Sequence, residues 1–193
     1  MKSGWATAVL LVGPARAPHV ADRRVIELSD PVVPSSRQPY HAVMGASRAA
    51  GAKLEQHLRK VVERVTRRSV GVLLREYRTA GHDVRAAGLV VGSTIDPARI
   101  ANDHIRAHAL EGQLFRVVLA DAAGSFELPC TVVVEREAYT EAARVLRRSP
   151  GDLKRAVAGF GRSLGGPWRA DEKTAAAAAW MVLHRPALRR TRD

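Results

Sequence analysis

Residues 88–118 read GLVVGSTIDPARIANDHIRAHALEGQLFRVV, and the fold that we expect is built around them. The apolar run at residues 89–91 lies between two glycines, which is typical of a short buried strand. Asp96 followed by Pro97 predicts a helix start, because aspartate caps the first turn and proline fits the first helical position. The stretch therefore predicts a strand, a turn and a helix that continues to about Ala122.

Apolar runs and helical periodicity predict further elements on both sides of this unit. We expect strands at residues 6–12, 25–28 and 126–135, with a turn region at residues 16–24. A long helix is expected from Ser47 to about Thr79, and shorter ones at residues 137–147, 151–164 and 171–184. The prolines of residues 31–40 indicate extended or looped chain, with room for an edge strand.

This order of elements predicts an α/β fold, with one mixed sheet and helices on both of its faces. The N-terminal strands can pair antiparallel as a hairpin or a meander, and the strands separated by helices form a parallel portion of the sheet. We expect a single domain over residues 1–193, since that length supports one good core. Its parts are a strand-rich segment (1–45), a long basic helix (46–80), an alternating strand and helix segment (88–185) and a basic tail (186–193).

The chain is strongly basic, with 31 lysines and arginines against 19 acidic residues, a formal net charge of +12 and an isoelectric point near 11.1. Such a balance favours an anionic partner such as nucleic acid. The alternative is a solvated basic surface with no such partner.

The cysteine count and the hydropathy of the chain indicate in which cellular compartment the protein is expected. Cys130 is the only cysteine, so no intrachain disulfide forms and a reducing, cytoplasmic location is expected. It lies in an apolar, strand-like run, which favours an inert thiol over a nucleophile. No apolar run reaches the length of a membrane span, so no membrane association is expected.

The order of elements and several short segments resemble the RNase H-like fold, and within it the RuvC-type Holliday-junction resolvases and their uncharacterised relatives. The resemblance covers residues 88–184 and, more loosely, the N-terminal strands. The segments that carry it are Gly88-Leu89-Val90-Val91, Ala107-His108-Ala109-Leu110-Glu111-Gly112, Glu127-Leu128-Pro129, Ser149-Pro150 and Ala170-Asp171-Glu172-Lys173-Thr174-Ala175-Ala176.

Active members of that family bind divalent metal through an Asp in the first strand, a Glu at the end of a later strand and acids on the last helix. Here residues 8–13 contain no carboxylate, and Ser93 stands where the Glu is expected. Only Asp171 and Glu172 match the acids of the last helix. Two-metal hydrolysis needs carboxylates around both ions, so the resemblance implies the fold with a lost or rebuilt active site.

A rebuilt site is suggested by His104, His108 and Glu111, which are spaced to share one helix face. Two imidazoles and a carboxylate can bind a divalent transition metal, with a fourth ligand from elsewhere in the chain or from water; Asp96 or Asp171 could complete such a site. The alternatives are buried-edge histidines bonded to carbonyls, with Glu111 paired to a cation such as Arg106, and a phosphate-binding face. Gly112 in mid-helix indicates close packing or access to this face.

Basic residues that could contact a phosphate backbone form two groups. Few aromatic residues accompany them, so base stacking is not the expected mode of binding. The groups are Arg59, Lys60, Arg64, Arg67 and Arg68 on the long helix, and Arg147, Arg148, Lys154 and Arg155 near the C-terminal helices.

Three functional hypotheses follow. The first is a nucleic-acid-associated protein with an RNase H-like fold and no canonical nuclease activity. The second is a metal-dependent hydrolase or nuclease in which His104, His108 and Glu111 act with Asp171 or Glu172. The third is a non-catalytic interaction module that forms a homodimer through the long helix.

Overall fold

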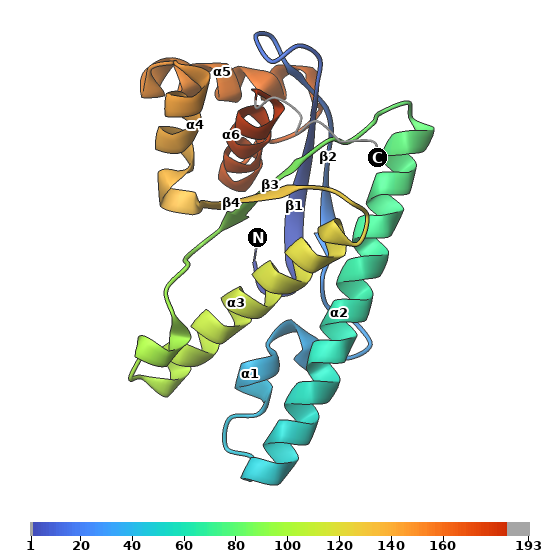
Figure 1. Ribbon diagram of the computed structural model, residues 1–193, viewed down its shortest axis with the longest axis vertical. Helices are drawn as coiled ribbons and strands as arrows, with labels where there is room; N and C mark the ends of the chain where they lie inside the picture. Colours follow the sequence, from blue (N-terminus) through green and yellow to red (C-terminus); the bar gives the residue numbers. More distant parts are fainter. Residues whose placement is uncertain (1, 185–193) are drawn as a thin grey trace, which may run out of the picture.

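A computed structural model describes residues 2–184 (Figure 1). The elements in chain order are β1 (Trp5–Val12), β2 (His19–Glu27), η1 (Pro34–Arg37), α1 (Pro39–Ala42), α2 (Arg48–Thr79), β3 (Ala87–Val91), η2 (Pro97–Arg99), α3 (Asp103–Gly124), β4 (Cys130–Val134), η3 (Glu135–Glu137), α4 (Ala138–Leu146), α5 (Pro150–Phe160), η4 (Gly161–Ser163) and α6 (Ala170–His184). The predicted α/β class is confirmed. The predicted basic tail, residues 186–193, lies outside the described residues.

The strands form two separate pairs. β1 and β2 are antiparallel, with Trp5 opposite Glu27 and Val12 opposite His19. β3 and β4 are parallel, with Ala87 opposite Cys130. Both pairings were predicted, but the two pairs are not hydrogen-bonded to each other. The expected single mixed sheet is therefore wrong in this respect, and two two-stranded sheets stand in its place.

Helix α6 packs against both sheets and links them. It contacts β1 on one side and β3 on the other, and Ala176, Ala177 and Ala178 are completely buried. The approach to β3 is close because Gly88 has no side chain: a Cβ atom at this position would lie 3.0 Å from Ala178. Small residues on both elements thus allow the helix to hold the two strand pairs together.

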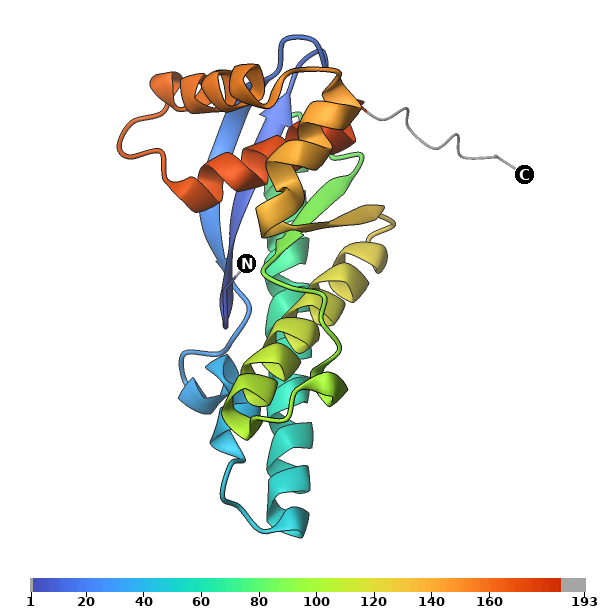
Figure 2. The ribbon, with the colours of Figure 1, turned by 90° about the vertical axis from the view of Figure 1, so that its left-hand side faces the viewer.

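The buried apolar residues form two hydrophobic cores. One surrounds α6 and is closed by α4 and α5, with Leu153, Val157 and Met181 fully buried. The other lies where α2 crosses α3, and it buries Val62 and Phe115. Figure 2 shows α1 and the first turns of α2 and α3 extending away from the end that carries α4, α5 and α6. Residues in α1 are therefore held by helices rather than by a sheet.

Capping residues explain one confirmed and one wrong helix boundary. Ser47 caps α2 as predicted, with its side chain accepting a hydrogen bond from the Ala50 N–H. Asp96 caps only the short η2, whereas α3 begins at Asp103 and is capped by Asn102. Residues 100–102 leave the helical conformation between the two caps. The helix predicted to start at residue 96 therefore starts later.

Other sequence predictions shift in smaller ways. The turn region expected at residues 16–24 belongs largely to β2, which begins at His19. The last predicted strand is shorter, because Glu127 takes a positive φ of 57° and Pro129 precedes β4. Residues 31–40 form η1 and the start of α1 rather than an edge strand. No helix among residues 2–184 combines the length and apolarity that crossing a membrane would require.

Two glycine-to-alanine substitutions test this packing in opposite directions. Gly88→Ala inserts a methyl group against Ala178, and we expect a loss of about 1–3 kcal/mol in the free energy of unfolding. Gly112→Ala, by contrast, meets nothing within 4 Å, and we expect a gain of up to about 1 kcal/mol from helix propensity. Urea denaturation of the two variants and the parent protein measures both effects. Equal stability of the two variants would contradict the close approach of α6 to β3.

Candidate metal centre

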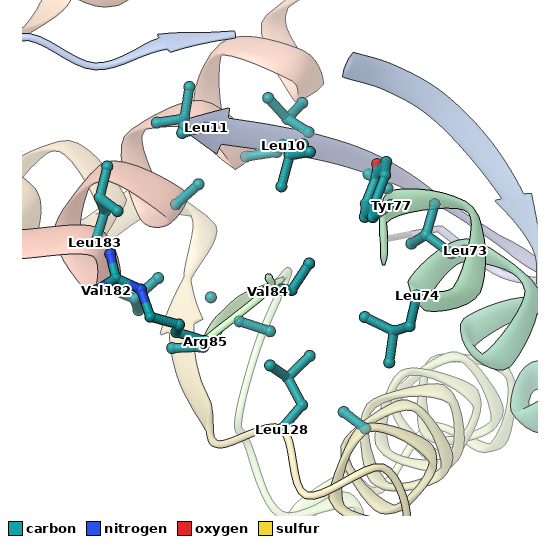
Figure 3. A pocket seen from close by; sticks show the side chains of 18 of the residues that line it. Leu10, Leu11, Leu73, Leu74, Tyr77, Val84, Arg85, Leu128, Val182 and Leu183 are labelled. Carbon is teal, nitrogen blue, oxygen red and sulfur yellow. The ribbon is translucent and has the colours of Figure 1, made fainter. Parts of the chain in front are cut away.

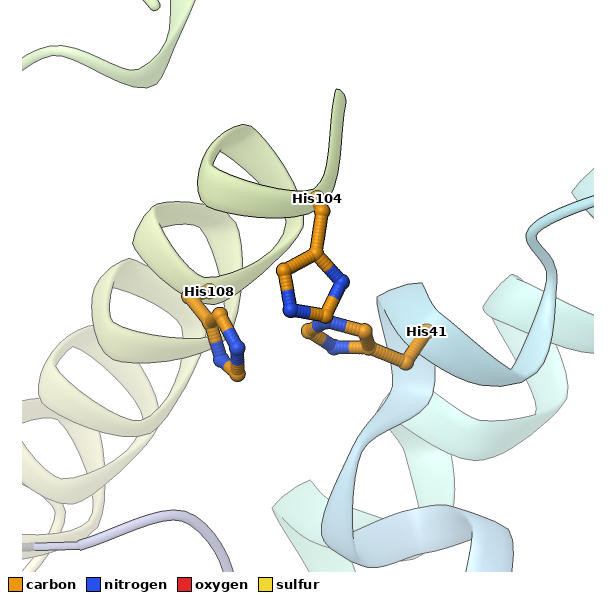
Figure 4. Close-up of side chains that lie close together, drawn as sticks. All are labelled: His41, His104 and His108. Atoms are coloured by element: carbon orange, nitrogen blue, oxygen red, sulfur yellow. The ribbon is translucent and has the colours of Figure 1, made fainter. Parts of the chain in front are cut away.

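Three histidine side chains from two helices meet at one point. His104 and His108 lie one turn apart on α3, and His41 reaches them from α1 (Figure 4). The ring centroids are 4.2 to 4.8 Å apart. One nitrogen of each ring lies within 4.8 Å of the others, and no other group of histidine, cysteine and acidic residues in the described part of the chain has this geometry.

The position of His41 depends on the segment that precedes it. Ser36 is completely buried, and its hydroxyl donates to the Val33 carbonyl at 2.6 Å and accepts from the Asp30 N–H at 2.9 Å. Pro39, also fully buried, opens α1. The short helix then packs on α2 and α3. These contacts fix a four-residue helix that could not be stable alone.

Glu111 lies beneath the histidines and is completely buried. Its Oε1 accepts a hydrogen bond from His41 Nδ1 at 2.8 Å and a longer one from the His41 N–H at 3.4 Å. Its Oε2 is 3.7 Å from His108 Nδ1 and has no hydrogen-bond partner. A buried carboxylate normally requires full hydrogen bonding or a nearby cation. In Glu111 only Oε1 is hydrogen-bonded, and Oε2 has no hydrogen-bond partner among the described residues.

The second ring nitrogen of His41 is also unsatisfied. Because Nδ1 bonds to Glu111, the atom that faces away from the carboxylate is Nε2, which is buried and has no hydrogen-bond partner. Buried polar atoms are rarely left unpaired, so this nitrogen is available to a ligand that can reach it. His104 and His108 are exposed, so the cluster is reached from solvent.

The structure regroups the residues that were expected to bind metal. His104, His108 and Glu111 come together as predicted, but Glu111 contacts the histidines and the third imidazole belongs to His41. Sequence reasoning missed His41, because no spacing relates residue 41 to residues 104–108. Arg106 donates to the Ile100 carbonyl and pairs with Asp103, so the predicted pairing of Arg106 with Glu111 is wrong.

The proposed acids of the last helix are held elsewhere. Asp171 accepts a hydrogen bond from Thr7 Oγ1 of β1 at 2.7 Å, and Glu172 pairs with Arg23 of β2 at 2.9 Å. Desolvation tends to raise the pKa of the Asp171 carboxyl, but hydrogen bonds from Thr7 and from the backbone N–H groups of residues 171 and 172 hold it below its usual value. Both acids therefore connect α6 to the hairpin and lie outside the histidine cluster, as does Asp96.

The nine basic residues expected to bind nucleic acid are all exposed. Several have local partners: Arg59 pairs with Glu55, Arg64 with Asp30 and Arg155 with Asp152, while Arg148 lies over the Trp180 ring. Arg64 donates to Asp30 and holds the pKa of that carboxyl below its usual range. Six of the nine form no ion pair with a carboxylate of the described residues, namely Lys60, Arg67, Arg68, Arg147, Arg148 and Lys154.

Cys130 is partly buried at the start of β4. Burial raises the pKa of its thiol, which keeps the reactive thiolate scarce. This agrees with the prediction of an inert cysteine.

Comparison with known proteins assigns no family. No protein-family model matches the chain, and no curated protein is significantly similar to it in sequence. The side-chain geometry of the histidine cluster is therefore the basis on which a function can be argued.

Removing Glu111 tests the buried contact. Glu111→Ala leaves the two His41 donors without an acceptor, and we expect a loss of about 1–3 kcal/mol in unfolding free energy. Glu111→Gln retains an acceptor oxygen and should lose less. His108→Ala, at an exposed position, should change stability by no more than about 0.5 kcal/mol. Denaturant unfolding without metal measures all three, and an Ala variant as stable as the parent would contradict the contact.

Proposed function

We propose that this protein is a metal-dependent hydrolase whose centre is a divalent transition-metal ion bound by His41, His104 and His108. The observation that carries the proposal is the convergence of three imidazoles above a buried carboxylate that orients one of them. Three protein ligands with one open position are typical of catalytic zinc sites, whereas structural sites have four.

The spacing of the histidines suits a tetrahedral ion after small side-chain rotations. Nitrogens bound about 2.0–2.1 Å from a tetrahedral zinc lie about 3.3 Å from one another, and the three nitrogens here lie within 4.8 Å. His104 and His108 are exposed and free to rotate by the required amount. The more buried His41 is already held by its hydrogen bond to Glu111.

Glu111 supplies the hydrogen-bond acceptor that usually orients a metal-bound histidine. Ligating imidazoles commonly donate their second N–H to a carboxylate, which fixes the tautomer and the ring orientation. With its Nδ1–H donated to Glu111 Oε1, His41 directs the lone pair of Nε2 into the cluster. An ion bound there gives that buried nitrogen a partner and balances the charge of the carboxylate.

The open side of the site supports hydrolysis. The fourth position faces solvent beside His104 and His108, so a water molecule or a substrate oxygen can occupy it. A metal in such a site lowers the pKa of a bound water to about 7 and polarises a phosphoryl or carbonyl oxygen. The net charge of +12 favours an anionic substrate.

Metal addition should stabilise the folded protein through these three residues. At a free Zn²⁺ concentration 100 times the Kd, we expect about 2.7 kcal/mol of stabilisation, or roughly 5–10 °C in Tm. His41→Ala, His104→Ala and His108→Ala should each remove most of the shift. His57→Ala, a variant of an exposed histidine on α2, should keep it. Thermal unfolding after chelator treatment and metal addition measures the effect.

Two outcomes would overturn the metal centre: no shift with Zn²⁺, Co²⁺ or Mn²⁺, or a full shift in the triple alanine variant. The hydrolytic part is tested with a chromogenic phosphodiester. Turnover should require metal and be lost in His104→Ala. Metal binding without turnover would leave a metal-binding protein and contradict the hydrolase.

A second candidate is the nucleic-acid-associated protein suggested by the resemblance to RuvC-type resolvases and the RNase H-like fold. What supports it is the exposure of all nine basic residues named for this role, together with the net charge. The absence of a carboxylate from β1 argues for binding without the usual two-metal nuclease chemistry. The third hypothesis, a homodimer formed through α2, stays a prediction. Among the described residues, Leu54 is the one large apolar side chain of α2 that is exposed to solvent.

Backbone binding to nucleic acid should be steeply salt-dependent. We expect log K for duplex DNA to fall linearly with log salt, with a slope of about −0.9 for each phosphate contact. The double variant Lys60→Ala/Arg67→Ala should reduce the slope by about two. Arg136→Ala/Arg162→Ala removes two other exposed cations and should leave it nearly unchanged. Absence of binding at low salt would remove this candidate.

A further inference from the structure

A cavity of about 1010 Å³ lies between the two strand pairs. Its walls come from β1, the C-terminal half of α2, the loop at residues 81–86, β3, the C-terminal half of α3, residues 128–131 and α6. Figure 3 shows side chains from these segments pointing into a common space, among them Leu10, Leu74, Leu128 and Val182. The cavity is distinct from the histidine cluster, since His41, His104 and His108 are absent from its lining.

The separation of the two sheets creates this space. β1 and β3 both contact α6, but no ladder of hydrogen bonds joins them. Between them the walls are mainly leucine, valine and alanine side chains. The Tyr77 hydroxyl, one of the polar groups in the lining, donates to Asp22 at 2.8 Å and is therefore already satisfied.

The apolar side chains of the cavity walls favour a ligand with a hydrocarbon chain. The volume is at the upper limit of the range of about 300–1,000 Å³ that holds small ligands. Water in such a space finds few polar partners, and transfer of apolar groups out of water is favourable. A space lined by several segments of one chain admits a flexible small molecule more readily than the surface of another folded protein.

The polar end of the ligand is indicated by Arg85. This residue belongs to the lining, is exposed, and its side chain has no hydrogen bond or ion pair with another described residue. Guanidinium groups bind carboxylates in a two-point geometry. Asp83 of the same loop has the opposite charge and also lines the cavity, but the surplus of positive charge over the chain favours an anionic head group.

We propose that this cavity binds one long-chain carboxylic acid per protein molecule, with the alkyl chain between β1 and β3 and the carboxylate at Arg85. The binding is non-covalent and does not depend on the metal centre. The ligand occupies part of the space between the unpaired strands and connects the two sheets through apolar contacts.

Calorimetric titration with dodecanoic acid below its micellar concentration tests the proposal, with dodecanol and dodecylamine as head-group controls. We expect one acid per chain, bound about fivefold more tightly than the alcohol, because an exposed ion pair contributes little. Arg85→Gln should remove this preference and leave binding of the alcohol unchanged. Equal binding of acid and alcohol to the parent protein, or tighter binding of the amine, would overturn the assignment of the head group.

A blocking variant tests the location. Val84 lies in the loop and points into the cavity (Figure 3), so Val84→Trp should weaken binding about tenfold or more. Val117→Trp places the same side chain at an exposed position of α3 outside the cavity and should have no effect. The triple histidine variant should bind the acid like the parent, which separates this site from the metal centre. No binding by the parent, or full binding by Val84→Trp, overturns the proposal.

Discussion

The close contact between α6 and β3 is the constraint on which the rest of the structure depends. The two strand pairs share no hydrogen-bond ladder, so they are connected mainly through the helix that packs on both. Gly88 and the buried alanines of α6 allow an approach that larger side chains would prevent. Because no ladder joins β1 to β3, an apolar cavity remains between them, lined by α6 and by the C-terminal half of α2.

The histidine cluster uses a different part of the molecule. It forms where α1 meets α3, at the end away from α4 and α5, and its core element is a buried carboxylate with incomplete hydrogen bonding. A protein tolerates such a group when a structural or functional partner compensates it. The proposed metal ion is that partner, and it would also attach a four-residue helix to α3. The histidine cluster and the cavity thus have separate physical origins, and the roles proposed for them can be tested independently.

Local signals predicted elements well and boundaries less well. Ser47 and the apolar periodicity after it located α2, and the run at residues 6–12 located β1, because both patterns depend on neighbours in the chain. Asp96 was a weaker guide, since it caps only the short η2, and Asn102 offers a second cap after residues 100–102 have left the helical conformation. For the site, the spacing of His104, His108 and Glu111 predicted one helix face. His41 was missed, because its helix is too short to show a periodic pattern.

Residue type and short-range spacing were enough to predict the α/β class, the antiparallel and parallel strand pairings, the strong positive charge and two of the three clustered histidines. Three features became visible only in the folded chain: the strands form two sheets, Asp171 and Glu172 bond to the hairpin, and His41 reaches Glu111 across 70 residues. Contacts between residues so far apart depend on how helices pack. Packing is a property of fitted surfaces, which no local pattern encodes.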